Sequence, residues 1–153
     1  MDLQRLKTAA AIAPLVLALG LLGGQGARAH GDADERRLGI QVDTLAASTH
    51  QWDGDPLPAY PRSRPEIKIL RITIPAGVTL PVHTHPVINA AVITQGRLEL
   101  RLSSGATRVF EAGEALVEVV NRLHTGRALP GSDVEVIVFY AGTPGTPVTL
   151  IQP

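Results

Sequence analysis

Three histidines are the residues of this chain whose type and spacing could do chemistry. His83 and His85 are separated by one residue, so both imidazoles lie on the same face if the chain is extended there. His124 comes from a later part of the chain and can bring a third imidazole to the pair. Three neutral imidazoles with a fourth position open suit a catalytic metal ion better than a structural one. The alternative is a pocket that holds these side chains without a metal.

Two further polar residues stand near the histidines in the sequence. Asn89 continues the face that carries the first two histidines, which places an amide oxygen near the pair. Glu118 stands six residues before His124, in the otherwise apolar run 115–120. Its carboxylate either faces solvent from the polar side of a sheet or acts in the site, as a fourth ligand or as an acid–base group. Strand alternation leaves both alternatives open.

The ligand types narrow the choice of ion. Nitrogen-rich sites suit transition metals better than Mg²⁺ or Ca²⁺, so we expect one divalent transition-metal ion, with Fe, Mn, Cu, Ni and Zn all left open. The chain has no cysteine, which excludes a thiolate metal site, a disulfide framework and a cysteine nucleophile. Its 14 basic residues balance its 14 acidic ones, so no field of one sign directs the protein to nucleic acid.

The elements that must position these side chains have the pattern of short β-strands. Gly and Pro contribute 15 and 12 of the 153 residues, which disfavours a helical bundle. Short β-branched runs alternate with turn residues, and this rhythm predicts an all-β domain, either an antiparallel sandwich or a barrel. The expected strands are residues 39–45 (at an edge), 67–74, 87–94, 98–102, 107–110, 115–120, 134–140 and 148–151.

The first 29 residues have the layout of a secretory signal peptide. Arg5 and Lys7 precede an apolar run over residues 9–22, and the Ala-Arg-Ala of residues 27–29 offers a cleavage site. We therefore expect residues 1–29 to be removed and the protein to be exported, to the periplasm or the extracellular space, with no membrane attachment afterwards. An uncleaved anchor is the alternative, although the apolar run is shorter than the roughly 20 residues that span a bilayer.

Residues 30–65 are interpreted as an N-terminal extended arm ahead of a barrel domain at 66–153. Residues 52–65 contain four prolines, which argues against a helix or a central strand there. Trp52 and Tyr60 are expected to lie on the surface of the core as anchors of the arm.

Gly77, His83, His85, Asn89 and Gly96 occur at the spacing of a known motif. Together they resemble the first motif of the cupin family, with Asn89 where that motif usually has glutamate. The resemblance implies that His83 and His85 are metal ligands and that Asn89 takes the position of the carboxylate ligand. A neutral amide binds a hard cation more weakly than a carboxylate does, so Asn89 ligates through its oxygen, bonds a metal-bound water or leaves the place to solvent.

A second stretch, from Gly113 to His124, is similar to the second cupin motif, whose single histidine completes the metal site. The usual proline and glycine of that motif appear here as Val119 and Asn121. The resemblance spans residues 66–141. It implies a double-stranded β-helix, or jelly-roll barrel, that holds the metal inside and often assembles as a homodimer.

Two classes of function are compatible with these motifs. One is a mononuclear metal-dependent oxidoreductase or isomerase acting on a small molecule, since a three-histidine site resembles the ligand sets of some cupin dioxygenases. The other is a non-catalytic small-molecule or sugar-binding protein of the cell envelope. The fold by itself does not choose between them, but both predict a small-molecule ligand inside the barrel.

Overall fold

The structure, a computed structural model, describes residues 38–152. Regular structure within this range is entirely β. Residues 38–152 accordingly offer no helix with the length and apolar character that a membrane crossing requires. The expected signal peptide, residues 1–29, lies outside the described residues. Residues 43–152 belong to one compact unit.

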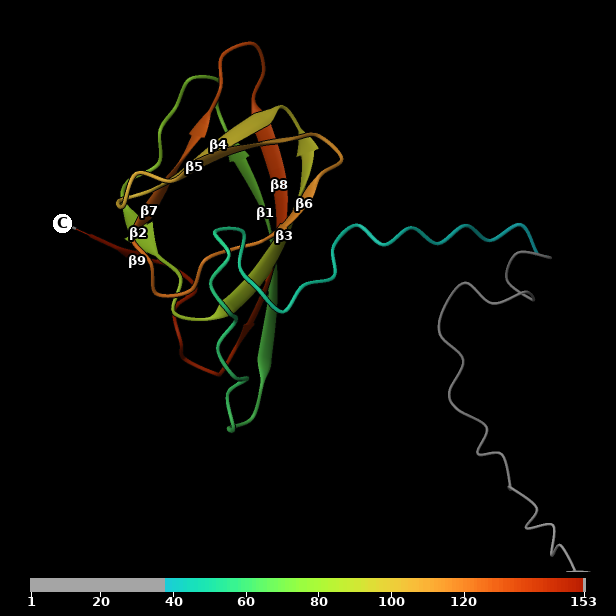
Figure 1. Ribbon diagram of the computed structural model, residues 1–153, viewed down its shortest axis with the longest axis vertical. Helices are drawn as coiled ribbons and strands as arrows, with labels where there is room; N and C mark the ends of the chain where they lie inside the picture. The colour runs from blue at the N-terminus through green and yellow to red at the C-terminus, as the bar shows by residue number, and fades with distance from the viewer. Residues whose placement is uncertain (1–37, 153) are drawn as a thin grey trace, which may run out of the picture. The chain divides into compact units, whose positions relative to one another are not determined.

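The described strands form two antiparallel sheets (Figure 1). They are β1 Glu66–Ile74, β2 His83–Thr84, β3 Ile88–Gln95, β4 Arg97–Leu102, β5 Thr107–Glu111, β6 Ala115–Val117, β7 His124–Ala128, β8 Val134–Gly142 and β9 Leu150–Ile151. One sheet has the order β1-β8-β3-β6 and the other the order β5-β4-β7-β2-β9. Most neighbours within a sheet are not consecutive in sequence, so the chain passes repeatedly between the sheets. This topology confirms the predicted all-β jelly roll.

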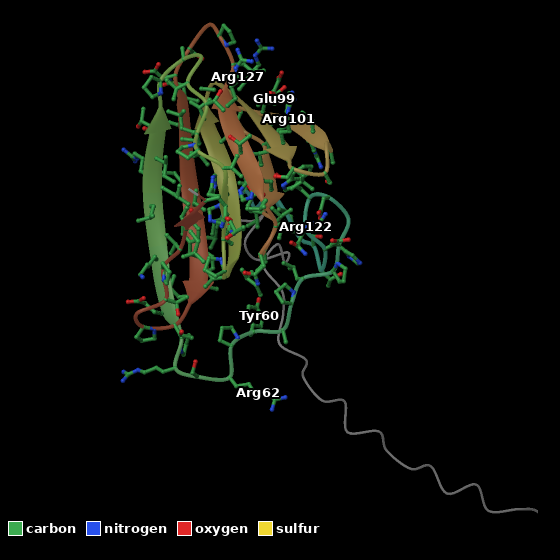
Figure 2. The ribbon with its side chains drawn as sticks, turned by 90° about the vertical axis from the view of Figure 1, so that its left-hand side faces the viewer. Tyr60, Arg62, Glu99, Arg101, Arg122 and Arg127 are labelled. Atoms are coloured by element: carbon green, nitrogen blue, oxygen red, sulfur yellow. The ribbon has the colours of Figure 1, made fainter. Side chains whose placement is uncertain are left out.

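Alternation along β4 shows how the sequence assigns one face of a strand to the core. Leu98, Leu100 and Leu102 are between 2% and 6% exposed. The charged residues between them point outward, where Arg101 lies 3.7 Å from Glu99 in an exposed ion pair (Figure 2). A strand with one buried and one solvated face is typical of antiparallel sheets.

A glycine makes the tight connection between β3 and β4. Gly96 has a φ of 75°, in the left-handed region, and a Cβ there would collide with the main-chain carbonyl oxygen of Asp133. Only glycine satisfies both conditions. This glycine allows the chain to cross directly from β3 in one sheet to β4 in the other.

A segment before β1 packs against the end of β6. The backbone N–H of Trp52 donates to the carbonyl of Val117 at 2.8 Å, and the N–H of Val120 donates to the side-chain oxygen of Gln51 at 2.6 Å. The Trp52 ring meets Phe110 edge-on, with ring centroids 6.4 Å apart. Trp52 therefore lies on the core surface, as the sequence suggested.

Three expectations from the sequence are wrong. Residues 39–45 form no strand, because their side chains are exposed and no described strand pairs with them, and an unpaired strand has little stability. The strand expected over 115–120 ends at Val117, where the following residues turn away toward β7. Tyr60 is 75% exposed, so its side chain is not packed on the core. Large side chains often remain in water, so its aromatic character alone was a weak indicator of burial.

Candidate metal centre

The three histidines predicted from the sequence lie together inside the barrel. His83 on β2 is paired directly with His124, the first residue of β7, and His85 follows at the end of β2. Their exposed fractions are 7%, 1% and 7%, in the order 83, 124 and 85. One ring nitrogen from each lies within 4.8 Å of the others, so a single ion can reach all three.

Hydrogen bonds fix the orientation of all three rings. Each Nδ1 lies against a main-chain carbonyl oxygen, which can only accept, so Nδ1 carries the proton and Nε2 keeps its lone pair. Such bonds to the far side of the ring are how proteins orient metal-binding imidazoles. The pairs are His83 with Pro81 at 2.7 Å, His85 with Val148 at 2.7 Å and His124 with Arg122 at 2.8 Å.

Burial keeps these imidazoles neutral. It is the largest cause that lowers the pKa of His83, His85 and His124, and it brings the pKa of His85 to about 4. The carbonyl partners act in the opposite direction but do not reverse the effect. Neutral imidazole is the form that binds a metal, so three fixed, uncharged Nε2 donors fit a divalent transition-metal ion.

Glu118 lies inside the barrel and not on its solvent face. The residue is only 7% exposed, so the solvent-facing alternative is wrong, and it lines the same cavity as the histidines. Its Oε1 accepts hydrogen bonds from the indole Nε1 of Trp52 at 2.7 Å and from the N–H of Val119 at 2.8 Å. Burial raises the pKa of Glu118 to about 7 despite these two donors. The carboxyl group can therefore hold or release a proton near neutral pH.

The compact cluster of ligand atoms among the described residues contains the three histidines and not Glu118. This separation favours an acid–base role for the carboxylate over a place as fourth ligand. The strand alternation of 115–120 could not reveal this, because β6 ends before Glu118 and the residue sits where the chain turns.

Asn89 occupies the cavity wall on β3. It is 1% exposed, and its Nδ2 donates to the carbonyl of Val87 at 3.3 Å. This bond uses one of the two N–H groups of the amide, so the other N–H and the amide oxygen are left for a ligand. The residue thus lines the site together with the histidines, and its place as a ligand stays a prediction.

Tyr140 is a member of the site that the sequence analysis did not identify. It lies opposite Asn89 in the pairing of β3 with β8, and its ring is 5.6 Å from the His85 ring. Burial raises the pKa of Tyr140 to about 12, so the phenol stays protonated. Its inward direction could have been read from the alternation of Val134, Val136 and Val138, but nothing in an apolar run marks a tyrosine as functional.

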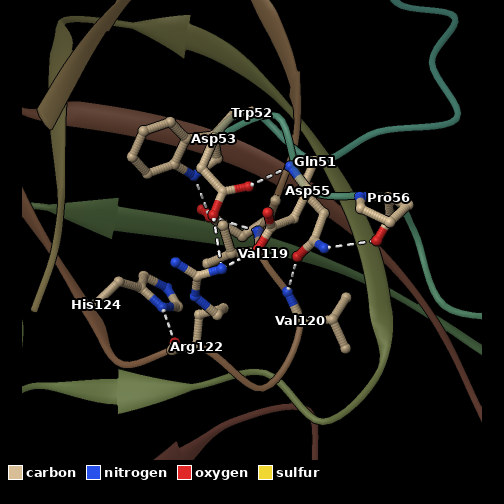
Figure 3. A network of polar contacts seen from close by, with 10 residues as sticks. Gln51, Trp52, Asp53, Asp55, Pro56, Val119, Val120, Arg122 and His124 are labelled. Carbon is tan, nitrogen blue, oxygen red and sulfur yellow. Dashed lines mark hydrogen bonds and ion pairs between the residues drawn. The ribbon is translucent and has the colours of Figure 1, made fainter. Parts of the chain in front are cut away.

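Arginine side chains near the site are turned away from it. Arg122 donates to the carboxylate of Asp55 and lies 3.4 Å from that of Asp53, in the network that surrounds Trp52 (Figure 3). Arg127 points outward from β7 (Figure 2). The cavity itself has a volume of about 260 Å³, and neither arginine contributes to its wall.

Comparisons with known proteins support the fold. No family model and no curated protein matches the chain. Among solved structures, DMSP lyase DddQ from Ruegeria pomeroyi is 19% identical with a TM-score of 0.50, and the match covers 65% of this chain and 47% of that one. An oxalate oxidase in complex with glycolate is 21% identical, with a TM-score of 0.47 and coverage of 56% and 45%. A cupin-like protein from Thermotoga maritima is 15% identical, with a TM-score of 0.48 and coverage of 56% and 64%.

This chain spans less than half the length of the lyase and the oxidase. At these identities the likeness concerns the fold alone. Together with the two-sheet topology, the match to the lyase supports the jelly-roll fold that the two motifs predicted. Membership of the cupin family stays a prediction.

Proposed function

We propose that this protein binds one divalent transition-metal ion through Nε2 of His83, His85 and His124 and uses the site for chemistry on a small molecule. The observation that carries the proposal is the fixed orientation of the rings. All three Nδ1 atoms are held by main-chain carbonyls, so three neutral Nε2 donors meet in a buried cavity. A metal bound there would act as a Lewis acid or as a redox centre for a ligand at its open position.

The side chains around the histidines supply proton transfer and orientation. Glu118 has one carboxylate oxygen held by Trp52 and Val119, and its pKa of about 7 allows it to accept and return a proton at neutral pH. Asn89 can orient a ligand through its amide oxygen. A buried proton carrier is what an isomerisation requires of the protein, so we propose an isomerase-type reaction ahead of an oxidoreductase.

A non-catalytic binding protein is the second candidate. It is favoured by the cavity wall, which is largely apolar and offers few polar groups besides those already described. The enzyme and the binding protein are distinguished by measuring whether the protein converts a bound small molecule into a product.

Metal binding is tested by direct measurement on the purified protein. We expect one equivalent of Co²⁺, Ni²⁺ or Zn²⁺ to bind, and we expect His83→Ala and His124→Ala each to weaken binding by about 100-fold or more. His50→Ala is the matched control, because His50 is exposed, lies outside the cavity wall, and has its ring hydrogen-bonded to the Thr49 hydroxyl. Equal binding by all of these variants would contradict the proposed site.

Catalysis is tested with Glu118→Gln, which keeps the shape of the side chain and removes the proton carrier. A panel of isomerisable and oxidisable small molecules is screened with metal-loaded protein, with and without oxygen. We expect the variant to retain the metal and to lose about 100-fold or more in rate. Activity that needs oxygen and survives in the variant would favour the oxidoreductase, and ligand binding without any turnover would favour the binding protein.

We also propose that the mature protein is exported after cleavage at residue 29 and that it forms a homodimer. Cell fractionation with N-terminal sequencing tests the first proposal. Light scattering on the purified protein tests the second.

A further inference from the structure

We infer that the cavity accepts a small molecule with one polar head group and an uncharged, apolar body, with the head beside the histidines. This inference rests on the proposed function and specifies the class of its ligand. Three features of the cavity carry it: the arrangement of polar and apolar residues in rows, the absence of a cationic side chain from the described wall, and the small size of the Ala91 side chain.

Four of the polar residues that line the cavity form one row across the two sheets. In one sheet Asn89 pairs with Tyr140, and in the other His83 pairs with His124. The contact between the His85 and Tyr140 rings, with centroids 5.6 Å apart, joins the two halves of this row. The groups able to bind a polar head are thus gathered at one level of the barrel.

The cavity-lining positions two residues further along the sheets are apolar. Two residues beyond the polar row, Ala91 pairs with Val138 in one sheet and Leu100 pairs with Gly126 in the other. All four line the cavity, and Val136 continues the apolar wall. A ligand with its head among the histidines must therefore place the rest of its body against hydrocarbon, where an unpaired charge or hydroxyl is costly.

The charges on the wall oppose a ligand with two anionic groups. Glu118 is the acidic residue of the described wall, which contains neither lysine nor arginine. The nearby Arg122 is engaged by Asp53 and Asp55. A bound metal ion can balance one anionic head, but no protein cation faces the apolar rows to balance a second anion.

One small residue leaves room for the body of the ligand. Gly126 does not add space, because a Cβ there would already lie 3.4 Å from the side chains of Leu80, Leu98 and Leu100. Ala91, in the other sheet, lines the cavity with only a methyl group. Enlarging Ala91 to leucine should therefore occupy the volume that the ligand needs without removing any polar group.

The experiment compares pentanoate with glutarate and with glucose. Pentanoate and glutarate differ at one end only, where pentanoate has a methyl group and glutarate a second carboxylate. Glucose represents a sugar. Each is titrated into Zn²⁺-loaded protein by calorimetry, with methyl NMR of leucine and valine side chains. We expect pentanoate to bind about tenfold or more tightly than glutarate and glucose, and to shift the methyl signals of Leu100, Val136 and Val138.

Matched variants locate the binding. Ala91→Leu is expected to weaken pentanoate binding by about tenfold or more while Zn²⁺ affinity is unchanged. Val109→Leu, at a half-exposed position on β5 outside the cavity wall, should change neither. Glutarate or glucose binding as tightly as pentanoate would overturn the inference. So would the absence of pentanoate binding, or binding that Ala91→Leu leaves intact.

The two proposals can fail separately. If Zn²⁺ does not bind, the proposed function fails, and the apolar rows are then tested with 1-pentanol on metal-free protein. Shifts of the same methyl groups would uphold the apolar part of the inference, and their absence would overturn it. If Zn²⁺ binds and the ligand preference is reversed, the metal site stands and the inference about the ligand fails.

Discussion

The indole Nε1 of Trp52 donates a 2.7 Å hydrogen bond to Oε1 of Glu118, across 66 residues of chain. This bond connects a segment that precedes the first strand to a carboxyl group inside the barrel. A hydrogen bond to a carboxylate favours the charged form, so Trp52 opposes the effect of burial on Glu118.

Trp52→Phe should therefore raise the pKa of Glu118 further, because the aromatic ring is kept while the donor is lost. We also expect the metal-free protein to lose about 1–2 kcal/mol of unfolding free energy, since the carboxyl oxygen loses a partner. Carbon-13 NMR of the Glu118 carboxyl gives the pKa, and urea unfolding gives the stability. An unchanged or lower pKa would show that this bond does not tune the carboxyl group.

The stability of the metal-free protein should depend on pH through Glu118. The pKa rises from 4.5 in the unfolded chain to about 7 in the folded state, so between these values the folded state holds the extra proton. Unfolding free energy therefore falls as pH rises through this window, by at most about 1.4 kcal/mol per pH unit, and is level above it. Glu118→Gln should lack this fall, so its stability relative to wild type should increase with pH up to about 7.

The histidines act with the opposite sign in the same measurement. The pKa of His85 is about 4 when folded and 6.5 in the unfolded chain, so stability is lost as pH falls below 6.5. Because wild type and Glu118→Gln share the histidines, the difference between their urea unfolding curves isolates the carboxyl group. A difference that does not vary between about pH 5 and pH 8 would contradict the raised pKa.

Metal binding should stabilise the fold, because the histidines come together only in the folded chain. With free Zn²⁺ at about 100 times its Kd, the unfolding free energy should rise by about 2.7 kcal/mol. EDTA should reverse the rise, and His85→Ala should abolish it. Unfolding of wild type and of His85→Ala, each with Zn²⁺ and with EDTA, checks this rise in unfolding free energy. His50→Ala is the control. An equal rise in His85→Ala would place the ion elsewhere.

Asn121 should be replaceable by glycine but not by a β-branched residue. Its φ of 56° is the one left-handed value at a non-glycine residue among the described positions, and asparagine tolerates that region. Its N–H donates to the carbonyl of His85 at 2.8 Å, so the turn also supports the site. We expect Asn121→Gly to be nearly neutral and Asn121→Val to cost about 1–3 kcal/mol in urea unfolding. An equal loss of unfolding free energy in Asn121→Gly and Asn121→Val would show that backbone strain does not determine which residues position 121 accepts.

The backbone conformation of Asn121 also bears on a difference between residues 113–124 and the cupin motif that they resemble. Asparagine at 121 stands where the motif usually has glycine, and it adopts the backbone conformation for which glycine is favoured. Asparagine is suited to this turn, because it tolerates the left-handed conformation better than most residues with a side chain.

The strands and the shared face of His83 and His85 could be predicted from local periodicity, whereas the jelly-roll topology and the place of His124 were predicted from the resemblance to the two motifs. Strand alternation places His83 and His85 on one face, and the two motifs bring His124 to the same barrel. The position of Glu118 could not be predicted, because it depends on where β6 ends and on a bond to Trp52. The spacing of residues in the sequence does not indicate a hydrogen bond between two segments as far apart as these.

The contact between Trp52 and Glu118 also gives the protein a built-in optical reporter. Trp52 is the single tryptophan of the chain, so all indole fluorescence comes from one ring whose N–H touches a carboxyl group of the cavity. Protonation of that carboxyl group, or the arrival of an ion beside it, changes the electric field on the fluorophore. The emission of the unlabelled protein can therefore be used to follow events inside the barrel in real time.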